Sequence, residues 1–424
     1  MALKRALGLP ALTFYGVGVI LGAGIYSVLG AAAARAGDAL WLTFAAGSVV
    51  AFLTALSYAE LATAYPRASA EFNYLRRAFP RWRGLALVTG LLVALSGAAT
   101  AATVAIAFAG YLQTFLAVPS AMAAWGLLAA ATAVNVVGVK ESAWVNTAFT
   151  LLEAGGLVLF VVLGAGSDRF GAAILTVPNA GVVAATALVF FSFLGFENIA
   201  NLAEEAKDPK RDLPRAIFLS LGIATTLYVL VALAAVALLP AEQLGEAQAP
   251  LAAAARARST KVAGALGGIA LFATANTALV SMLVASRVVY GIARERELPK
   301  TMGSVLARRQ TPWAATLVVA AVSAALVPFG NVGVVASLSS FASLLAFAAV
   351  NVALIVLRYR EPHEERPFRV PGAIGRFPIL PAVGAATTIA VATQLDRTAL
   401  ISGAGALVVF SAYSVWKHRA KNRA

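Results

Sequence analysis

The chain contains no cysteine, only two histidines and few charged residues, which make up 12% of its 424 positions. Without cysteine, a disulfide to a partner subunit cannot form. The two histidines, His363 and His418, stand in polar segments outside the apolar runs. The sequence offers no cluster of metal ligands and no pairing of a nucleophile with a general base. We therefore expect no disulfide-linked partner, no metal, no cofactor and no enzymatic activity.

Apolar residues, in contrast, are abundant: they make up 60% of the chain, and the mean hydropathy is +0.83. A soluble protein could not cover that much apolar surface with polar groups. The composition therefore predicts a polytopic membrane protein whose partner is the lipid bilayer. The net charge of +14 would suit nucleic acid. Its basic residues lie between apolar runs, where the positive-inside bias places them, so no nucleic-acid partner is expected.

Bridging the hydrocarbon core takes about 20 apolar residues per helix. The sequence predicts twelve spans, at residues 9–33, 39–64, 84–116, 121–139, 142–164, 182–203, 214–239, 262–291, 313–329, 331–357, 375–394 and 398–416. An even number of spans puts both termini on one side. Of the 33 lysines and arginines, 26 fall on that side, 6 on the other, and Arg287 within a span. This asymmetry predicts cytoplasmic termini in a multi-pass protein of the cell membrane.

Two of these spans are interrupted by residues that disfavour a continuous apolar helix. Glycines crowd the centre of the first span at Gly22-Ala23-Gly24, and the sixth span carries Gly195 and Glu197 within the segment 191–198. The two spans lie five helices apart, and an odd number of helices per repeat inverts the second copy. Paired interruptions in corresponding helices indicate a binding site between inverted repeats.

The chemistry of the two interruptions is complementary. An unwound Gly22-Ala23-Gly24 exposes backbone N–H groups beside a half-helix N-terminus, which favours an anion such as a carboxylate. An unwound stretch from Phe191 to Leu194 exposes carbonyl groups that can accept hydrogen bonds from an ammonium group. An α-amino acid, or a closely related small amine, satisfies both ends.

Three stretches of the sequence resemble the amino acid–polyamine–organocation (APC) superfamily of transporters, in the order that the family has them. They are the glycine-rich run Gly22-Ala23-Gly24-Ile25, the run from Phe193 to Glu197 followed by the loop from Glu204 to Ile217, and the run from Ala285 to Arg294 followed by Leu298-Pro299. The glycine run is weak alone, whereas the other two are long and specific. The resemblance covers residues 7 to about 369.

The resemblance implies an all-α fold of twelve transmembrane helices, with a 5+5 inverted repeat, broken helices one and six, and two extra C-terminal helices. A single domain would occupy residues 1–416, with repeats at about 9–164 and 182–357, extra helices at about 375–416 and a basic cytoplasmic tail at 417–424. Carried over by position, the substrate site would contain Gly22, Ala23, Gly24 and Ile25 at the carboxylate end and Phe191, Ser192, Leu194 and Gly195 at the amine end.

Two glutamates are candidates for ion coupling. Many proton-coupled members of the family place a lysine where Glu153 stands, so the family's lysine mechanism cannot be transferred. Glu153 lies mid-span among apolar residues, where an ionisable group is costly. It either carries a coupling proton, ties helices together structurally, or forms with Thr277 an oxygen-rich site for sodium. Glu197 is either a gating group or a cap on the restarted half-helix.

The sequence therefore predicts a secondary transporter of amino acids or small amines, coupled to protons. An amino acid exchanger and a sodium-coupled symporter are alternatives within the same class. A sensor that binds without transporting is an alternative from another class. An ion channel would need a continuous polar pore lining, and these spans are too apolar. Arg287 is expected either to snorkel to the membrane surface or to form an ion pair with a cytoplasmic carboxylate, for which Glu60, near the cytoplasmic end of the second span, is a candidate.

Overall fold

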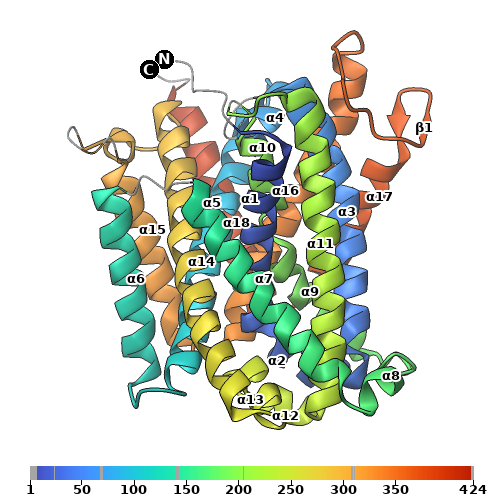
Figure 1. The fold of residues 1–424 in the computed structure, drawn as a ribbon. Helices are drawn as coiled ribbons and strands as arrows, with labels where there is room; N and C mark the ends of the chain where they lie inside the picture. Colours follow the sequence, from blue (N-terminus) through green and yellow to red (C-terminus); the bar gives the residue numbers. More distant parts are fainter. Residues whose placement is uncertain are drawn as a thin grey trace.

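The chain folds into a bundle of helices. The computed structural model describes residues 7–22, 24–66, 70–138, 143–203, 205–306, 309 and 311–421. Figure 1 shows long helices packed side by side along one direction. The α-helices are α1 (Leu9–Leu21), α2 (Gly24–Ala36), α3 (Leu40–Ala64), α4 (Ala70–Ala78), α5 (Arg83–Leu112), α6 (Ser120–Val137), α7 (Ala143–Ala165), α8 (Arg169–Ala173), α9 (Gly181–Val189), α10 (Phe196–Asn201), α11 (Pro209–Leu238), α12 (Ala241–Glu246), α13 (Pro250–Arg256), α14 (Thr260–Arg294), α15 (Trp313–Leu326), α16 (Val332–Arg360), α17 (Ile379–Ala392) and α18 (Arg397–Lys421).

Short elements connect these helices. The 3-10 helices are η1 (Gly37–Ala39), η2 (Phe190–Phe193), η3 (Lys300–Gly303) and η4 (Val327–Phe329). The strands β1 (Ala373–Ile374) and β2 (Phe377–Pro378) form a small antiparallel hairpin before α17. Figure 1 shows the short helices α12 and α13 at one end of the bundle and α4 at the other.

The long helices have the length and composition of membrane spans. Nine stretches of the described chain are long and apolar enough to cross a membrane. The first of them, Leu9–Ala64, contains two of the predicted spans, and two further predicted spans correspond to the shorter apolar helices Trp313–Phe329 and Ile379–Ala392. The chain is thus an all-α polytopic membrane protein, while the exact number of crossings stays a prediction.

Several long helices start at side-chain caps. Asp208, Ser259 and Asn331 accept hydrogen bonds from backbone N–H groups in the first turns of α11, α14 and α16, at 3.3, 3.3 and 2.8 Å. Such oxygens satisfy donors that have no partner within the helix. The caps fix where these helices begin.

Two helix boundaries near the C-terminus differ by a few residues from the predicted ones. The eleventh span was expected to begin at residue 375, but Gly375 lies in the hairpin turn with φ at +61°, and α17 begins at Ile379. Glycine adopts this left-handed backbone at little cost, so the turn precedes the helix. The basic tail from residue 417 was expected to be separate, whereas α18 continues as far as Lys421.

Both interruptions that the sequence suggests are present as breaks in helical geometry. α1 ends at Leu21 and α2 restarts at Gly24. In the second break, α9 gives way to η2, Leu194 is extended, and Gly195 has φ at +125° before α10 begins. L side chains rarely adopt that φ, so the backbone at this point requires glycine.

Candidate functional site

The two breaks lie against each other. A methyl group at Gly24 would stand 2.7 Å from Cα of Ser192, and one at Gly195 would stand 2.7 Å from Cγ1 of Val19. Real Cβ atoms essentially never stand within 3.0 Å of such heavy atoms, so these glycines permit the contact between the broken helices. The first break therefore meets the second, and the segment that precedes the first break packs on Gly195.

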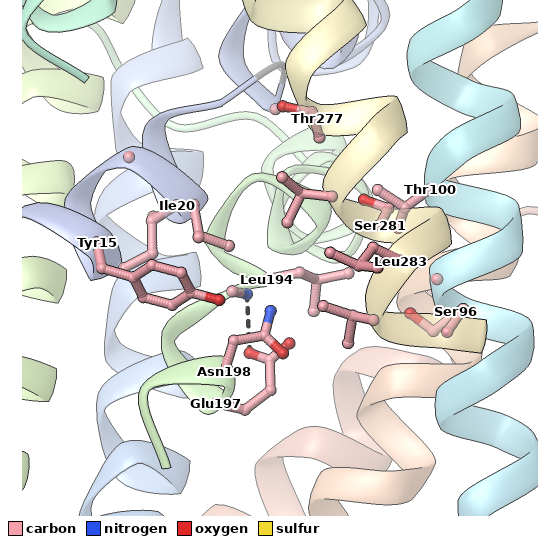
Figure 2. Close-up of a pocket in the computed structure, with 18 of the residues that line it drawn as sticks. Tyr15, Ile20, Ser96, Thr100, Leu194, Glu197, Asn198, Thr277, Ser281 and Leu283 are labelled. Atoms are coloured by element: carbon pink, nitrogen blue, oxygen red, sulfur yellow. Dashed lines mark hydrogen bonds between the residues drawn. The ribbon is translucent and has the colours of Figure 1, made fainter. Parts of the chain in front are cut away.

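A cavity of about 360 Å³ lies beside the two breaks. Figure 2 shows how the side chains that line it are arranged, with α1 on one side and α14 and α5 on the other. Its polar lining includes Tyr15, Ser96, Thr100, Glu197, Asn198, Thr277 and Ser281. The cavity volume lies within the range of small-molecule sites.

Most of the predicted site residues line this cavity. They are Gly24, Phe191, Ser192, Leu194, Gly195, Glu197 and Thr277. Three others, Gly22, Ile25 and Glu153, are not part of the lining. Ala23 lies outside the described residues.

Gly22 and Ile25 have structural surroundings that differ from those expected. The Gly22 N–H donates to the Gly18 carbonyl at 3.1 Å, because it still belongs to the last turn of α1. A methyl group at Gly22 would stand 2.5 Å from Oγ1 of Thr277, so the first break also packs on α14. Ile25 is fully buried in the apolar core.

Tyr228 of α11 joins the two breaks, although it stands in an apolar span with nothing nearby to mark it. Its hydroxyl lies within hydrogen-bond distance of the Ile20 carbonyl at the end of α1 and, at 3.0 Å, of the Ser192 carbonyl. A hydroxyl has one proton to donate, so the carbonyls share it. A carbonyl oxygen has two lone pairs, so Ser192 keeps an acceptor position. Tyr228 therefore links the two backbone segments beside the cavity.

Glu197 caps the restarted half-helix. Its Oε2 accepts a hydrogen bond from the Gly195 N–H at 2.8 Å, as Figure 2 shows. A carboxylate at this position is favoured by the partial positive charge of a helix N-terminus. The side chain is only partly buried and faces the cavity. Glu197 can therefore cap the restarted half-helix and still be available as a gating group.

Glu153 of α7 is buried away from the cavity, with only 2% of its surface exposed. It interacts electrostatically with Tyr26 of α2 and Tyr228 of α11. Within the described chain, the Tyr26 hydroxyl and Oε2 of Glu153 have no hydrogen-bond partner. Thr277 lines the cavity, and Glu153 does not. The Glu153 carboxyl group therefore lies outside the cavity lining and close enough to Tyr228, which joins the breaks, to interact with it electrostatically.

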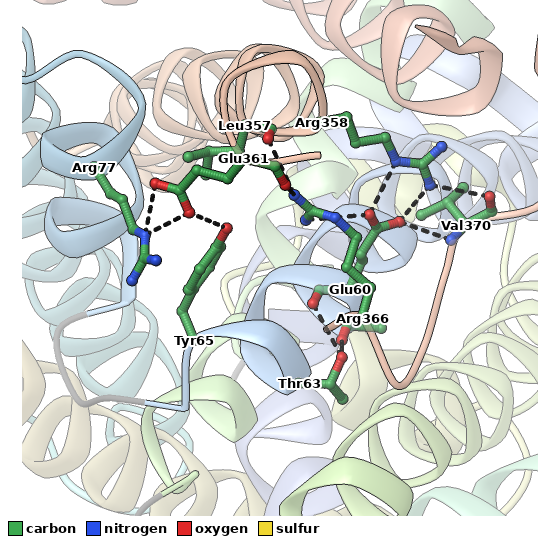
Figure 3. A network of polar contacts seen from close by, with 10 residues as sticks. Glu60, Thr63, Tyr65, Arg77, Leu357, Arg358, Glu361, Arg366 and Val370 are labelled. Atoms are coloured by element: carbon green, nitrogen blue, oxygen red, sulfur yellow. Dashed lines mark hydrogen bonds and ion pairs between the residues drawn. The ribbon is translucent and has the colours of Figure 1, made fainter. Parts of the chain in front are cut away.

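The sequence made Glu60 a candidate partner of Arg287, but the structure pairs Glu60 with other arginines. It forms a buried network with Arg358 and Arg366, which Figure 3 shows at the end of α3. Nε of Arg358 donates to Oε1 of Glu60 at 2.9 Å, and the Val370 N–H donates to Oε2 at 2.8 Å. Arg287 instead lines the cavity, with its side chain exposed. The network ties α3 to the end of α16 and to the segment that follows it.

A neighbouring network extends this connection toward α4. The Arg77 Nε and the Tyr65 hydroxyl both donate to Glu361, at 2.8 Å each to Oε2. The Arg77 guanidinium also lies over the Tyr65 ring, 4.2 Å from its centroid. Figure 3 shows the two networks side by side. This end of the bundle is therefore held by charges from three separate segments of the chain.

Comparisons with known proteins agree with this architecture. The model of the amino acid permease family matches residues 7–410. An uncharacterized transporter of Mycobacterium tuberculosis is 33% identical over 97% of this chain and 91% of its own. The branched-chain amino acid permease BcaP of Bacillus subtilis is 29% identical over 90% and 86%, and a methylthioribose transporter of the same organism is 29% identical over 91% and 87%. The chain belongs to the amino acid permease family, within the APC superfamily.

Proposed function

We propose that this chain is a secondary active transporter of amino acids or closely related small amines, coupled to protons and working by alternating access. The observation that carries the proposal is the meeting of two broken helices at a cavity of about 360 Å³. Backbone N–H and carbonyl groups at such breaks bind the charged ends of small solutes in transporters. Membership of the amino acid permease family supports the same solute class.

The proposed topology is the one that the sequence predicts. Twelve spans would place both termini in the cytoplasm of a cell-membrane protein, with inverted repeats at about 9–164 and 182–357. The two extra helices, α17 and α18, would lie outside the repeats. Alternating access would then move the broken helices relative to the rest of the bundle.

The substrate would lie where the cavity meets the breaks. Gly24, at the start of α2, would face the carboxylate, since a half-helix N-terminus favours an anion. Carbonyls of Phe191, Ser192 and Leu194 would accept hydrogen bonds from the amine. The free acceptor position on Ser192 supports this assignment, since Tyr228 uses the other.

Uptake into proteoliposomes tests the proposal. The purified chain is reconstituted, and labelled amino acids, amines and methylthioribose are offered under a proton gradient, a sodium gradient or neither. We expect accumulation of at least one amino acid or amine under a proton gradient. Transport of none of them would refute the function. Accumulation driven only by sodium, or exchange that persists after both gradients are collapsed, would replace proton coupling by the corresponding alternative.

Glu153→Gln is expected to separate binding from coupling. Glutamine resembles the protonated carboxyl in size and polarity but cannot release a proton. Substrate binding and counterflow should persist, whereas accumulation driven by a pH gradient should fall to the level seen without a gradient. The measurement compares counterflow with pH-driven uptake in the same proteoliposomes. Unchanged pH-driven accumulation would make Glu153 a structural residue.

Tyr228→Phe is expected to slow uptake about tenfold, which is the effect of losing one buried hydrogen bond of ordinary strength. The ring should stay in place, because it packs on Phe44 and Phe193 with centroids 5.6 and 5.5 Å away. Initial uptake rates measure the effect. Tyr359→Phe, on an exposed side chain of α16, is the control and should leave the rate unchanged. A wild-type rate in Tyr228→Phe would show that the hydroxyl link is dispensable.

A further inference from the structure

The cavity is acidic, although the chain as a whole carries a net charge of +14. Among the described residues that line it, Glu71, Glu197 and Glu205 bear carboxylates and Arg287 bears a guanidinium. Three negative charges against one positive charge give a negative lining when all four groups are ionised. A cleft lined by one sign of charge concentrates solutes of the opposite sign. The cavity therefore favours positively charged solutes.

Two of these carboxylates come from elements that meet at one wall of the cavity. The Ala70 N–H at the start of α4 donates to Oδ1 of Asn201 at the end of α10, at 3.0 Å. This contact brings Glu71 of α4 toward Glu197 of α10, and the two carboxyl groups are close enough to interact electrostatically. The Tyr58 hydroxyl of α3 donates to Oε1 of Glu71 at 2.9 Å and orients it.

Neither carboxylate has a cationic partner in the ion pairs of the described residues. Glu71 is 3% exposed, and burial raises the pKa of its carboxyl group. The buried Tyr74 hydroxyl also interacts electrostatically with Glu71, yet it makes no hydrogen bond within the described part of the chain. A buried carboxylate without a counter-charge is costly. A cation held in the cavity would offset that cost.

We propose that Glu71 and Glu197 form a subsite for the terminal ammonium group of a basic substrate, such as a basic amino acid or a diamine. The subsite deepens the proposed function and rests on it, since it assigns a substrate class to the same cavity. An ammonium group offers three donors and carries a full charge. Two carboxylates from separate elements would supply acceptors for it.

The other charged groups of the cavity lining have defined places in this scheme. Arg287 of α14 opposes a bound cation, and it forms none of the ion pairs found among the described residues. Glu205 follows the second break and is half-buried. It adds negative charge to the cavity without taking part in the Tyr58 and Asn201 contacts that hold the pair together.

Lysine and norleucine provide a matched pair of ligands, because they differ chiefly by the terminal ammonium group. Binding of each to the purified full chain is measured by calorimetry or thermal shift. The wild type should bind lysine about tenfold more tightly than norleucine, as expected for hydrogen bonds to a charged group. In Glu71→Gln that ratio should fall to about one. Norleucine should bind the variant as it binds the wild type, which also shows that the variant is folded.

Glu205→Gln is the control: it removes the same charge from the same cavity but takes part in neither the Tyr58 nor the Asn201 contact, so it should reduce the preference for lysine by less than Glu71→Gln does. Tyr58→Phe keeps Glu71 but removes the hydrogen bond that orients it, so the preference for lysine should fall part of the way. This second variant tests the subsite even if Glu71→Gln does not fold. Retention of the full preference in Tyr58→Phe and Glu71→Gln would overturn the subsite. Norleucine binding by the wild type without a preference for lysine would overturn the subsite and leave the proposed function standing. Binding of no amino acid or amine would overturn both.

Discussion

Gly195→Ala is expected to reduce the initial rate of uptake by about a hundredfold, because the substitution strains the backbone and forces the two breaks apart, at a combined cost of a few kcal/mol. The φ of +125° at Gly195 disfavours any L side chain. The new methyl group would stand 2.7 Å from Cγ1 of Val19 and 3.1 Å from its carbonyl carbon. The side chain of Val19 can rotate, but its backbone cannot move without shifting α1. The second break would therefore lose its contact with the first.

A matched glycine elsewhere separates this effect from a general loss of flexibility. Gly222 lies in α11, and a methyl group there would meet no other atom within 4 Å. Gly222→Ala should transport at the wild-type rate, since alanine favours a helix more than glycine does. Both variants are first compared by thermal melting of the purified protein. Wild-type uptake by Gly195→Ala would show that the geometry of the second break is not needed for transport.

The breaks could be predicted from the sequence because their signal is local. Glycines and a glutamate stand out within an apolar run, and the cost of placing them there is the same in any fold that crosses a membrane. The choice of Phe191, Ser192 and Leu194 drew on that signal and on the family resemblance, and all three residues line the cavity. The sequence could not show which backbone carbonyls already accept a hydrogen bond, such as the Ser192 carbonyl from Tyr228.

The residues that the sequence missed depend on contacts between distant segments. Tyr228 stands in an unremarkable apolar span, and its role becomes visible only because its hydroxyl meets two breaks on other helices. Glu71 stands in a short segment between two spans, with no apolar run around it to mark its carboxylate as unusual. Glu60 pairs with Arg358, which follows it by 298 positions. Nearness in the sequence favoured Arg287 no more than Arg358, so the choice of partner needed the fold.

Glu60→Gln is expected to give the largest loss of stability, about 3–5 kcal/mol, because it leaves buried positive charges without their counter-charge. Glu60 is fully buried, and the side chains of Arg358 and Arg366 are 2% and 8% exposed. The Val370 N–H would also face a glutamine amide, which has one acceptor oxygen where the carboxylate had two. The apparent melting temperature of the purified protein measures the effect. A variant of an exposed pair, Glu365→Gln, is the control, since the Lys210–Glu365 contact lies in solvent and contributes little.

A double-mutant cycle between Glu60→Gln and Arg358→Gln distinguishes a paired charge from two independent losses. If the network acts as a unit, the double variant should be less destabilised than the sum of the two single variants, because each single change already breaks the pair. The remaining destabilisation should come from Arg366 and from the Val370 N–H, which keep no carboxylate to bind. Additive effects, or a Glu60→Gln variant that melts with the wild type, would contradict the network's stabilising role. The contact between α3 and α16 would then contribute nothing measurable to the stability of the bundle.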